Sequence, residues 1–135
     1  MTPRPLVLAA LLSSSCGPGP TSPPEIPLPA PPRFVFYGAT PEEQAFVCAT
    51  WEQLAGCVGL DPNKARAIPV TITEEQFFCS GVDAAGCAYS TPPSVTIRRS
   101  WWGIETSIRT ELLHLALLLN REDWGYDNPA FARCL

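Results

Sequence analysis

The chain of 135 residues contains a single histidine, His114, and this scarcity limits the metal sites that it can build. No site with two imidazole ligands can form within one chain. The six cysteines include no closely spaced Cys-x-x-Cys pair, so a cysteine-based metal site is not expected either. The usual ligand sets of protein zinc sites are therefore incomplete in this sequence.

The sequence also lacks a basic cluster, and it lacks a long apolar run beyond its N-terminus. Nine basic and 13 acidic residues give a net charge of -4, a balance that does not favour nucleic-acid binding. The apolar stretch 112–119 is interrupted by His114 and is too short to span a bilayer. We therefore expect one modest domain, without a nucleic-acid partner.

Residues 1–15 have the organisation of an export signal. A positive residue precedes the apolar run 6–12, and three serines lead to Cys16. The pattern resembles a bacterial lipoprotein signal, in which the cysteine becomes the first mature residue and carries a lipid, although Ser13 stands where leucine is usual. Lipidated Cys16 would anchor the protein to a bacterial membrane, facing the periplasm or the exterior. The alternative is an ordinary secretory signal cleaved among the serines, and both interpretations place the protein outside the cytoplasm.

Residues 16–32 follow as the anchoring cysteine and a tether. Eight prolines within 17–32 predict an extended segment that does not fold alone. The folded domain is expected over residues 33–135.

The folded domain is predicted to be α+β, with two main helices on a short and mostly antiparallel sheet. Thr40-Pro41-Glu42-Glu43 has the pattern of a capped helix start, and the helix should run to about Ala55. A second long helix is expected to begin between 100 and 104 and to end near 120. The expected strands are 33–37, 68–73, 88–89 and 94–98, and Pro69 favours a sheet edge for the second of them.

The second helix carries polar residues on an almost entirely apolar surface. Thr110 and His114 are one turn apart on the same face, and Glu111 lies beside them. In zinc peptidases a helix of this kind presents two histidine ligands and a general-base glutamate. Here a threonine occupies the position of the first ligand.

This motif and its flanks resemble a family of small bacterial envelope lipoproteins with a minimal zincin domain. The resemblance covers most of the folded part, through Cys57-Val58-Gly59, the loop from Phe78-Cys79 to Gly86-Cys87, Val95-Thr96-Ile97 and the ending 127–134. It implies a zincin-like fold, His114 as the second metal ligand and Glu111 as the base that polarises zinc-bound water. The family places a third histidine near the position of Tyr126.

Three interpretations of the motif remain open. The first is a chance Glu-x-x-His on a core helix. The second, which we favour, is a degenerate zincin scaffold used for binding or structure, with a peptide or another envelope protein as partner. For the chain as a whole, apart from these interpretations of the motif, a purely structural lipoprotein is an alternative.

The third interpretation is a working zinc peptidase with an atypical site. His114 would then hold zinc together with the weaker ligand candidates Asp123 or Asp127, while Glu111 takes a proton from bound water. Tyr126 would ligate the metal or stabilise an oxyanion, and a peptide substrate would align along residues 95–98.

The cysteines support export, because an oxidising compartment favours disulfides. Cys79 and Cys87 close a short loop, and Cys57 with Cys134 would tie the first helix to the C-terminus. Cys48 is then left as a buried free thiol, with a Cys48–Cys134 bridge as the competing pairing. The pair Trp101-Trp102 either anchors the second helix in the core or forms part of a binding surface.

Overall fold

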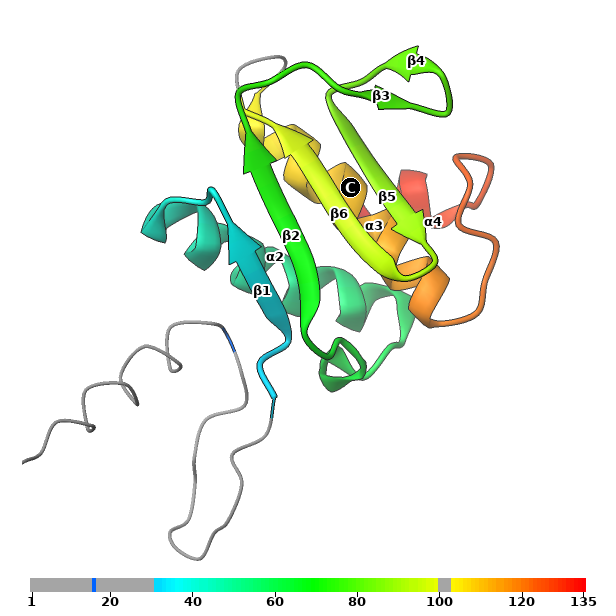
Figure 1. The fold of residues 1–135 in the computed structure, drawn as a ribbon. Helices are drawn as coiled ribbons and strands as arrows, with labels where there is room; N and C mark the ends of the chain where they lie inside the picture. Colours follow the sequence, from blue (N-terminus) through cyan, green and yellow to red (C-terminus); the bar gives the residue numbers. More distant parts are fainter. Residues whose placement is uncertain (1–15, 17–30, 100–102) are drawn as a thin grey trace, which may run out of the picture.

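The computed structural model describes Cys16, residues 31–99 and residues 103–135. Three α-helices lie on one face of a four-stranded sheet, and a two-stranded hairpin extends beyond one end of that sheet (Figure 1). The architecture is α+β, as the sequence predicts. The expected signal 1–15, most of the tether and Trp101-Trp102 lie outside the described residues. The elements in chain order are β1 (Phe34–Tyr37), α2 (Pro41–Val58), η1 (Pro62–Lys64), β2 (Ile68–Thr73), β3 (Phe78–Cys79), β4 (Val82–Asp83), β5 (Gly86–Ser90), β6 (Pro93–Arg98), α3 (Ile104–Leu119) and α4 (Ala130–Cys134).

The sheet is mixed rather than mostly antiparallel, which corrects the prediction from sequence. The strand order is β1-β2-β6-β5, with β1 parallel to β2, β2 parallel to β6, and only β5 antiparallel to β6. Helix α2 carries the chain back along the sheet between β1 and β2, so these neighbours run in the same direction. Alternation of apolar residues identifies a strand, but it does not reveal the direction of its neighbours.

Strand β2 lies inside the sheet, although Pro69 predicts an edge. Pairing with β6 begins only at Val70, so Pro69 lies where β2 has β1 as its one neighbour. The N–H of Ile68 donates to Arg33 O toward β1, and the next main-chain nitrogen therefore faces the side without a partner. Proline is tolerated there because no donor is required.

Helix α2 is fixed at its N-terminus by a capping box and in its middle by aromatic packing. Thr40 and Glu43 exchange hydrogen bonds between side chain and main chain, and Gly59 ends the helix with φ of 79°. Trp51 is fully buried, donates from Nε1 to Pro62 O at 2.9 Å and meets Phe34 edge to face. Buried residues of β1, α2 and α3 belong to one hydrophobic core, and α3 is the helix that carries the motif.

Three disulfides connect the described residues: Cys57–Cys134, Cys79–Cys87 and Cys16–Cys48. The first two are the pairs favoured by the sequence, and the third was not predicted. Cys48 is therefore not a free thiol, and it does not bond to Cys134. A Cys16 sulfur bonded to Cys48 has no valence left for a thioether-linked lipid, so lipidation of Cys16 remains a prediction only for chains that lack this bond.

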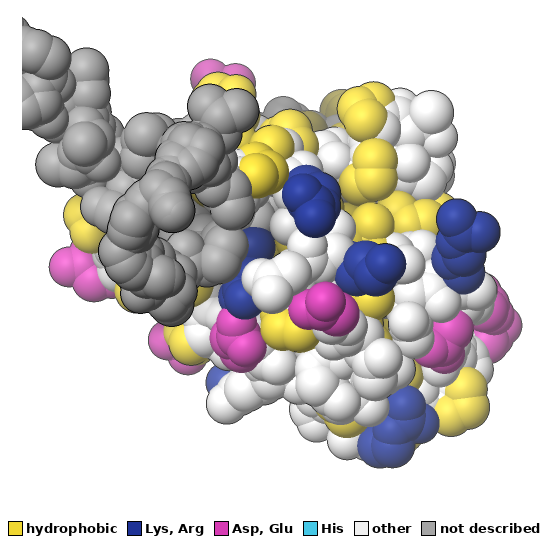
Figure 2. Space-filling view, turned by 90° about the horizontal axis from the view of Figure 1, so that it is seen from below, with side chains coloured by type: hydrophobic (Ala, Val, Ile, Leu, Met, Phe, Trp, Pro, Cys, Tyr) yellow, Lys and Arg dark blue, Asp and Glu magenta, His cyan; other side chains and the backbone are white. Residues whose placement is uncertain are grey.

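The surface of the molecule carries charges of both signs. On the face where β1 and β2 begin, basic and acidic side chains are interspersed with apolar ones (Figure 2). In the described segments, no helix is long and apolar enough to cross a membrane.

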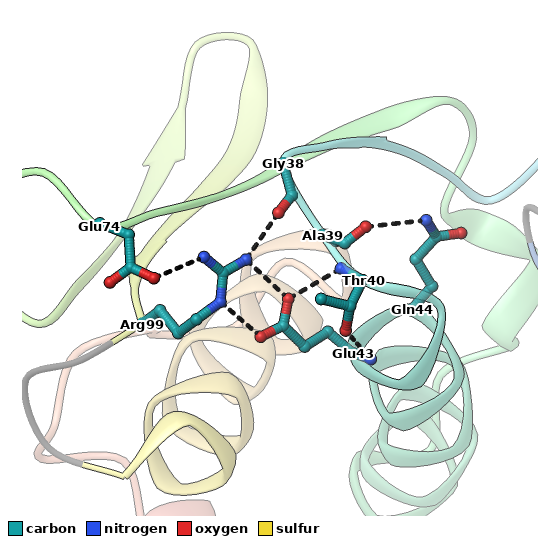
Figure 3. A network of polar contacts seen from close by, with 7 residues as sticks. All are labelled: Gly38, Ala39, Thr40, Glu43, Gln44, Glu74 and Arg99. Carbon is teal, nitrogen blue, oxygen red and sulfur yellow. Dashed lines mark hydrogen bonds and ion pairs between the residues drawn. The ribbon is translucent and has the colours of Figure 1, made fainter.

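At the end of the sheet opposite to the starts of β1 and β2, Arg99 links α2 to the segments that follow β1 and β2 (Figure 3). Its guanidinium contacts both carboxylate oxygens of Glu43, at 2.7 and 2.9 Å, and also bonds Glu74 at 3.0 Å and Gly38 O at 2.6 Å. The hydrogen bonds from Arg99 hold the pKa of Glu43 below its usual range. This network positions the start of α2 against the ends of β2 and β6, which fixes the helix layer relative to the sheet.

Candidate binding groove around Glu111 and His114

Helix α3 buries the two polar residues of the motif together with its apolar stripe. Glu111 is 6% exposed and His114 is 7% exposed. Their spacing of three residues puts both on the helix face that meets β5. The sequence pattern therefore placed this pair correctly.

His114 is held by one main-chain carbonyl and by three aromatic rings. Its Nδ1 lies 2.6 Å from Trp124 O, so the ring nitrogen donates there and the Nε2 lone pair remains available. Burial lowers the pKa of His114, and the bond to Trp124 opposes that shift only in part. The ring centroids of Tyr126 and Phe131 lie 4.6 and 4.7 Å from the imidazole. His114 is thus a neutral, packed histidine.

Glu111 is a buried carboxyl group without a partner in the described part of the chain, where no hydrogen bond or ion pair reaches its side chain. Burial raises the pKa of Glu111 to about 7. An unpaired charge at such a position is costly, so the neutral form persists to much higher pH than in water.

Glycine at position 86 allows this carboxyl group to lie against the first residue of β5. A Cβ atom at Gly86 would lie 2.5 Å from Glu111 Cγ and 2.8 Å from Oε2. Such distances are too short for any side chain, so only glycine fits here without movement. The sequence pattern predicts a loop at Gly86 and does not indicate this contact.

Two hollows open on either side of Glu111. One, of about 220 Å³, continues toward Ser107, Thr110 and the residues that precede β5. The other, of about 370 Å³, runs along β5 toward His114. Glu111, Gly86 and Tyr126 border both hollows. We call the two together the β5 groove.

The outer edge of β5 borders the β5 groove and has unpaired main-chain groups. The Ala85 carbonyl accepts a hydrogen bond from the Arg98 N–H at 2.8 Å, which sets the phase of pairing with β6. Bonded pairs alternate from this point, so the main-chain N–H and C=O groups of Gly86, Ala88 and Ser90 face away from β6. Among the described strands, none pairs with this edge.

Residues 95–98 cannot receive a peptide in the way that the sequence analysis expected. They belong to β6, which pairs with β2 on one side and with β5 on the other. Both edges of β6 are therefore occupied, and the available edge is that of β5. The direction and order of the strands, which the sequence did not reveal, caused this error.

The segment after α3 contains the three weaker ligand candidates, and only Tyr126 among them contacts a residue of the motif, namely His114. Tyr126 is 68% exposed and covers the His114 ring, and burial together with the charge of Glu111 raises its pKa. Asp123 accepts a hydrogen bond from the Gly125 N–H at 3.1 Å and thereby stabilises a turn. Asp127 is exposed.

Zinc, which the zincin resemblance implies, does not fit the donors that these residues bring together. Thr110 donates its hydroxyl proton to Thr106 O at 2.9 Å, and a neutral threonine hydroxyl is not among the usual zinc ligands. No group of three or more His, Cys, Asp or Glu side chains in residues 31–99 and 103–135 is placed to hold a metal ion. A catalytic zinc needs three firm protein ligands and one open position. His114 supplies only one such ligand.

Ser107 is a further residue of the groove that the sequence analysis did not identify. The residue is 3% exposed, and its Oγ has no hydrogen-bond partner among the described residues. It lies four residues before Glu111 and hence on the same helix face. The spacing of four residues makes Ser107 recognisable from the sequence as a neighbour of Glu111. Nothing in the sequence indicates that the Trp124 carbonyl bonds to His114.

Comparisons with protein-family models, curated proteins and solved structures found no match for this chain.

Proposed function

We propose that this chain is an exported protein whose zincin-like domain holds an extended peptide segment along the outer edge of β5, without hydrolysing it. The observation that carries the proposal is the unpaired edge of Gly86, Ala88 and Ser90 beside a groove of about 370 Å³. An extended peptide pairs with such an edge through main-chain hydrogen bonds, while pockets on the groove select its side chains.

Binding without hydrolysis follows from the chemistry of the donor set. In a zinc peptidase the glutamate activates a metal-bound water, and this needs a metal held by several protein ligands. Here one imidazole and one unpartnered carboxyl group face the groove. Glu111 is therefore assigned to ligand recognition rather than to proton transfer.

Export is supported by the three disulfides, which are typical of an oxidising compartment outside the cytoplasm. Attachment to a membrane through Cys16 stays a proposal for the form in which the Cys16–Cys48 bond is absent. In that form the partner would be another protein of the cell envelope.

The edge is tested by removing one outward-facing donor. Ala88→Pro deletes the N–H that points away from β6, whereas Ala88→Ser keeps it and serves as the matched control. Decapeptides selected from a random displayed library against the full chain are the probe. We expect Ala88→Pro to weaken their binding about fivefold or more, as loss of one peptide hydrogen bond requires, and Ala88→Ser to retain it. Thermal unfolding of both variants verifies that the fold persists.

Two results would contradict the proposal. Unchanged affinity in a folded Ala88→Pro variant would exclude pairing at the β5 edge. Cleavage of the selected peptides by the zinc-supplemented chain, abolished in Glu111→Gln, would replace binding by hydrolysis.

A further inference from the structure

We propose that the hollow between Glu111 and Ser107 is a recognition pocket for a primary ammonium group, presented by a lysine side chain of the bound peptide. This inference rests on the proposed function and names the peptide chemistry that the β5 groove selects. Three oxygen-bearing side chains border the hollow from one helix face, namely Ser107, Thr110 and Glu111.

Two of these side chains are buried with unused bonding capacity. The Glu111 carboxyl group makes no hydrogen bond or ion pair, and Ser107 Oγ has no partner, in the segments that the structure describes. Buried polar groups in native proteins are nearly always bonded, so the unbonded Ser107 Oγ, beside the Glu111 carboxyl group that borders the same hollow, indicates a ligand that supplies hydrogen-bond donors. A ligand that supplies only acceptors would leave the carboxylate unsatisfied.

The charge of the hollow calls for a cation. Asp83 also borders it, but its carboxylate already receives Arg98 Nη1 at 3.3 Å and Gln76 Nε2 at 2.9 Å. Glu111 is thus the acidic group whose charge is not compensated, and burial raises its pKa to about 7. A positive group inside the hollow would reverse that shift and stabilise the carboxylate.

The number of acceptors favours ammonium over guanidinium. An ammonium group has three donors around one nitrogen, and the α3 face that borders the hollow offers three separate side-chain acceptors, since Thr110 Oγ1 can still accept while it donates to Thr106 O. A guanidinium is planar and pairs best with both oxygens of one accessible carboxylate. Ala84, Ala85 and Gly86 form the remaining wall, which suits the aliphatic stem of a lysine.

Strand geometry brings a lysine to this place. In a strand added to the β5 edge, the residue opposite Gly86 has its side chain on the same sheet face as that of Gly86. This face meets Glu111, since a Cβ at Gly86 would touch that carboxyl group. The only lysine of this chain, Lys64, lies in η1 between α2 and β2, so the ligand must come from another molecule.

The test compares blocked peptides that differ at one position. The probes are acetyl-(Ala)₃-Lys-(Ala)₃-amide and the same peptide with norleucine or arginine in place of lysine, titrated onto the full chain. We expect the lysine peptide to bind at least about tenfold more tightly than the norleucine peptide, as one charge-assisted hydrogen bond requires. Arginine should bind more weakly than lysine.

Two variants and one control assign the preference to the hollow. Glu111→Gln keeps the size of the side chain and should reduce the preference for lysine over norleucine to less than about threefold, which is the effect of a neutral acceptor. Ser107→Ala should reduce it in part. Glu105→Gln, at an exposed position on the same helix, should leave it unchanged.

The outcomes separate this inference from the proposed function. Equal binding of lysine and norleucine peptides overturns the ammonium pocket and leaves peptide binding at the β5 edge intact. Arginine binding as tight as lysine binding overturns the ammonium assignment. Failure of all three peptides to bind, when the library-selected decapeptides still bind at the β5 edge, overturns the ammonium pocket alone, whereas failure of both sets of probes overturns both proposals.

Discussion

The stability of the protein should depend on pH through Glu111, and replacement by glutamine should remove this dependence. In the folded chain burial raises the pKa of Glu111 from 4.5 to about 7. Between these values the folded state holds a proton that the unfolded state releases. The stabilising effect of the proton is thus complete below pH 4.5, is lost as the pH rises toward 7, and is absent above it.

The magnitude follows from the two pKa values. The interval from 4.5 to about 7, at about 1.4 kcal/mol per pH unit, corresponds to about 3 kcal/mol. Glu111→Gln mimics the protonated carboxyl group and does not titrate. The variant should therefore match the parent near pH 4.5 and exceed it by about 3 kcal/mol at pH 8.

The assay is urea unfolding followed by tryptophan fluorescence at pH values from 4.5 to 8.5. His114 contributes in the opposite direction, because its lowered folded pKa makes stability fall below pH 6.5. It is present in both chains, so its contribution largely cancels in the difference. Glu105→Gln, which makes the same chemical change at an exposed position of the same helix, is measured alongside as the control. A free-energy difference between Glu111→Gln and the parent that is the same at pH 5 and pH 8 would refute the argument.

Three further predictions concern other parts of the fold. Gly86→Ala should destabilise the chain by about 1–3 kcal/mol, because the new methyl group overlaps the Glu111 side chain, and a second change of Glu111 to alanine should recover most of that loss in urea unfolding. Arg99→Gln should lower the thermal midpoint at pH 7 and flatten the loss of stability below pH 4.5, because the lowered pKa of Glu43 depends on this guanidinium; an unchanged acid profile would contradict this. The unreduced mature chain should have the mass of a form with three disulfides and no alkylatable thiol, and a lipid-sized mass increment on Cys16 would exclude its disulfide.

The sequence predicted the elements whose signals are local. Thr40 and Glu43 begin α2 as expected, and Gly59 ends it. The apolar spacing located α3 and placed Glu111 and His114 on one face. Capping and helical periodicity act within a few residues, so a single sequence contains the information needed to recognise them.

Features that depend on distant parts of the chain were not predictable in this way. Strand direction follows from the path of α2, and the interior position of Pro69 follows from where β6 begins. The contact between Gly86 and Glu111 joins a strand to a helix 25 positions later in the chain. The Cys16–Cys48 bond is not predictable from the sequence, because the signal pattern before Cys16 predicts that this cysteine carries a lipid.

Glu111 provides the strongest argument against a purely structural role for the groove. A scaffold that serves only structure gains nothing from a buried carboxyl group without a partner, since an amide of the same shape is cheaper to bury at neutral pH. When a cation is bound, the carboxylate has a partner, so glutamate at position 111 is then more favourable than glutamine. Glu111→Gln should therefore raise the free energy of unfolding at pH 8 while it removes the preference for lysine peptides. A structural role predicts the first effect without the second, and hence the two measurements on one variant distinguish the two interpretations.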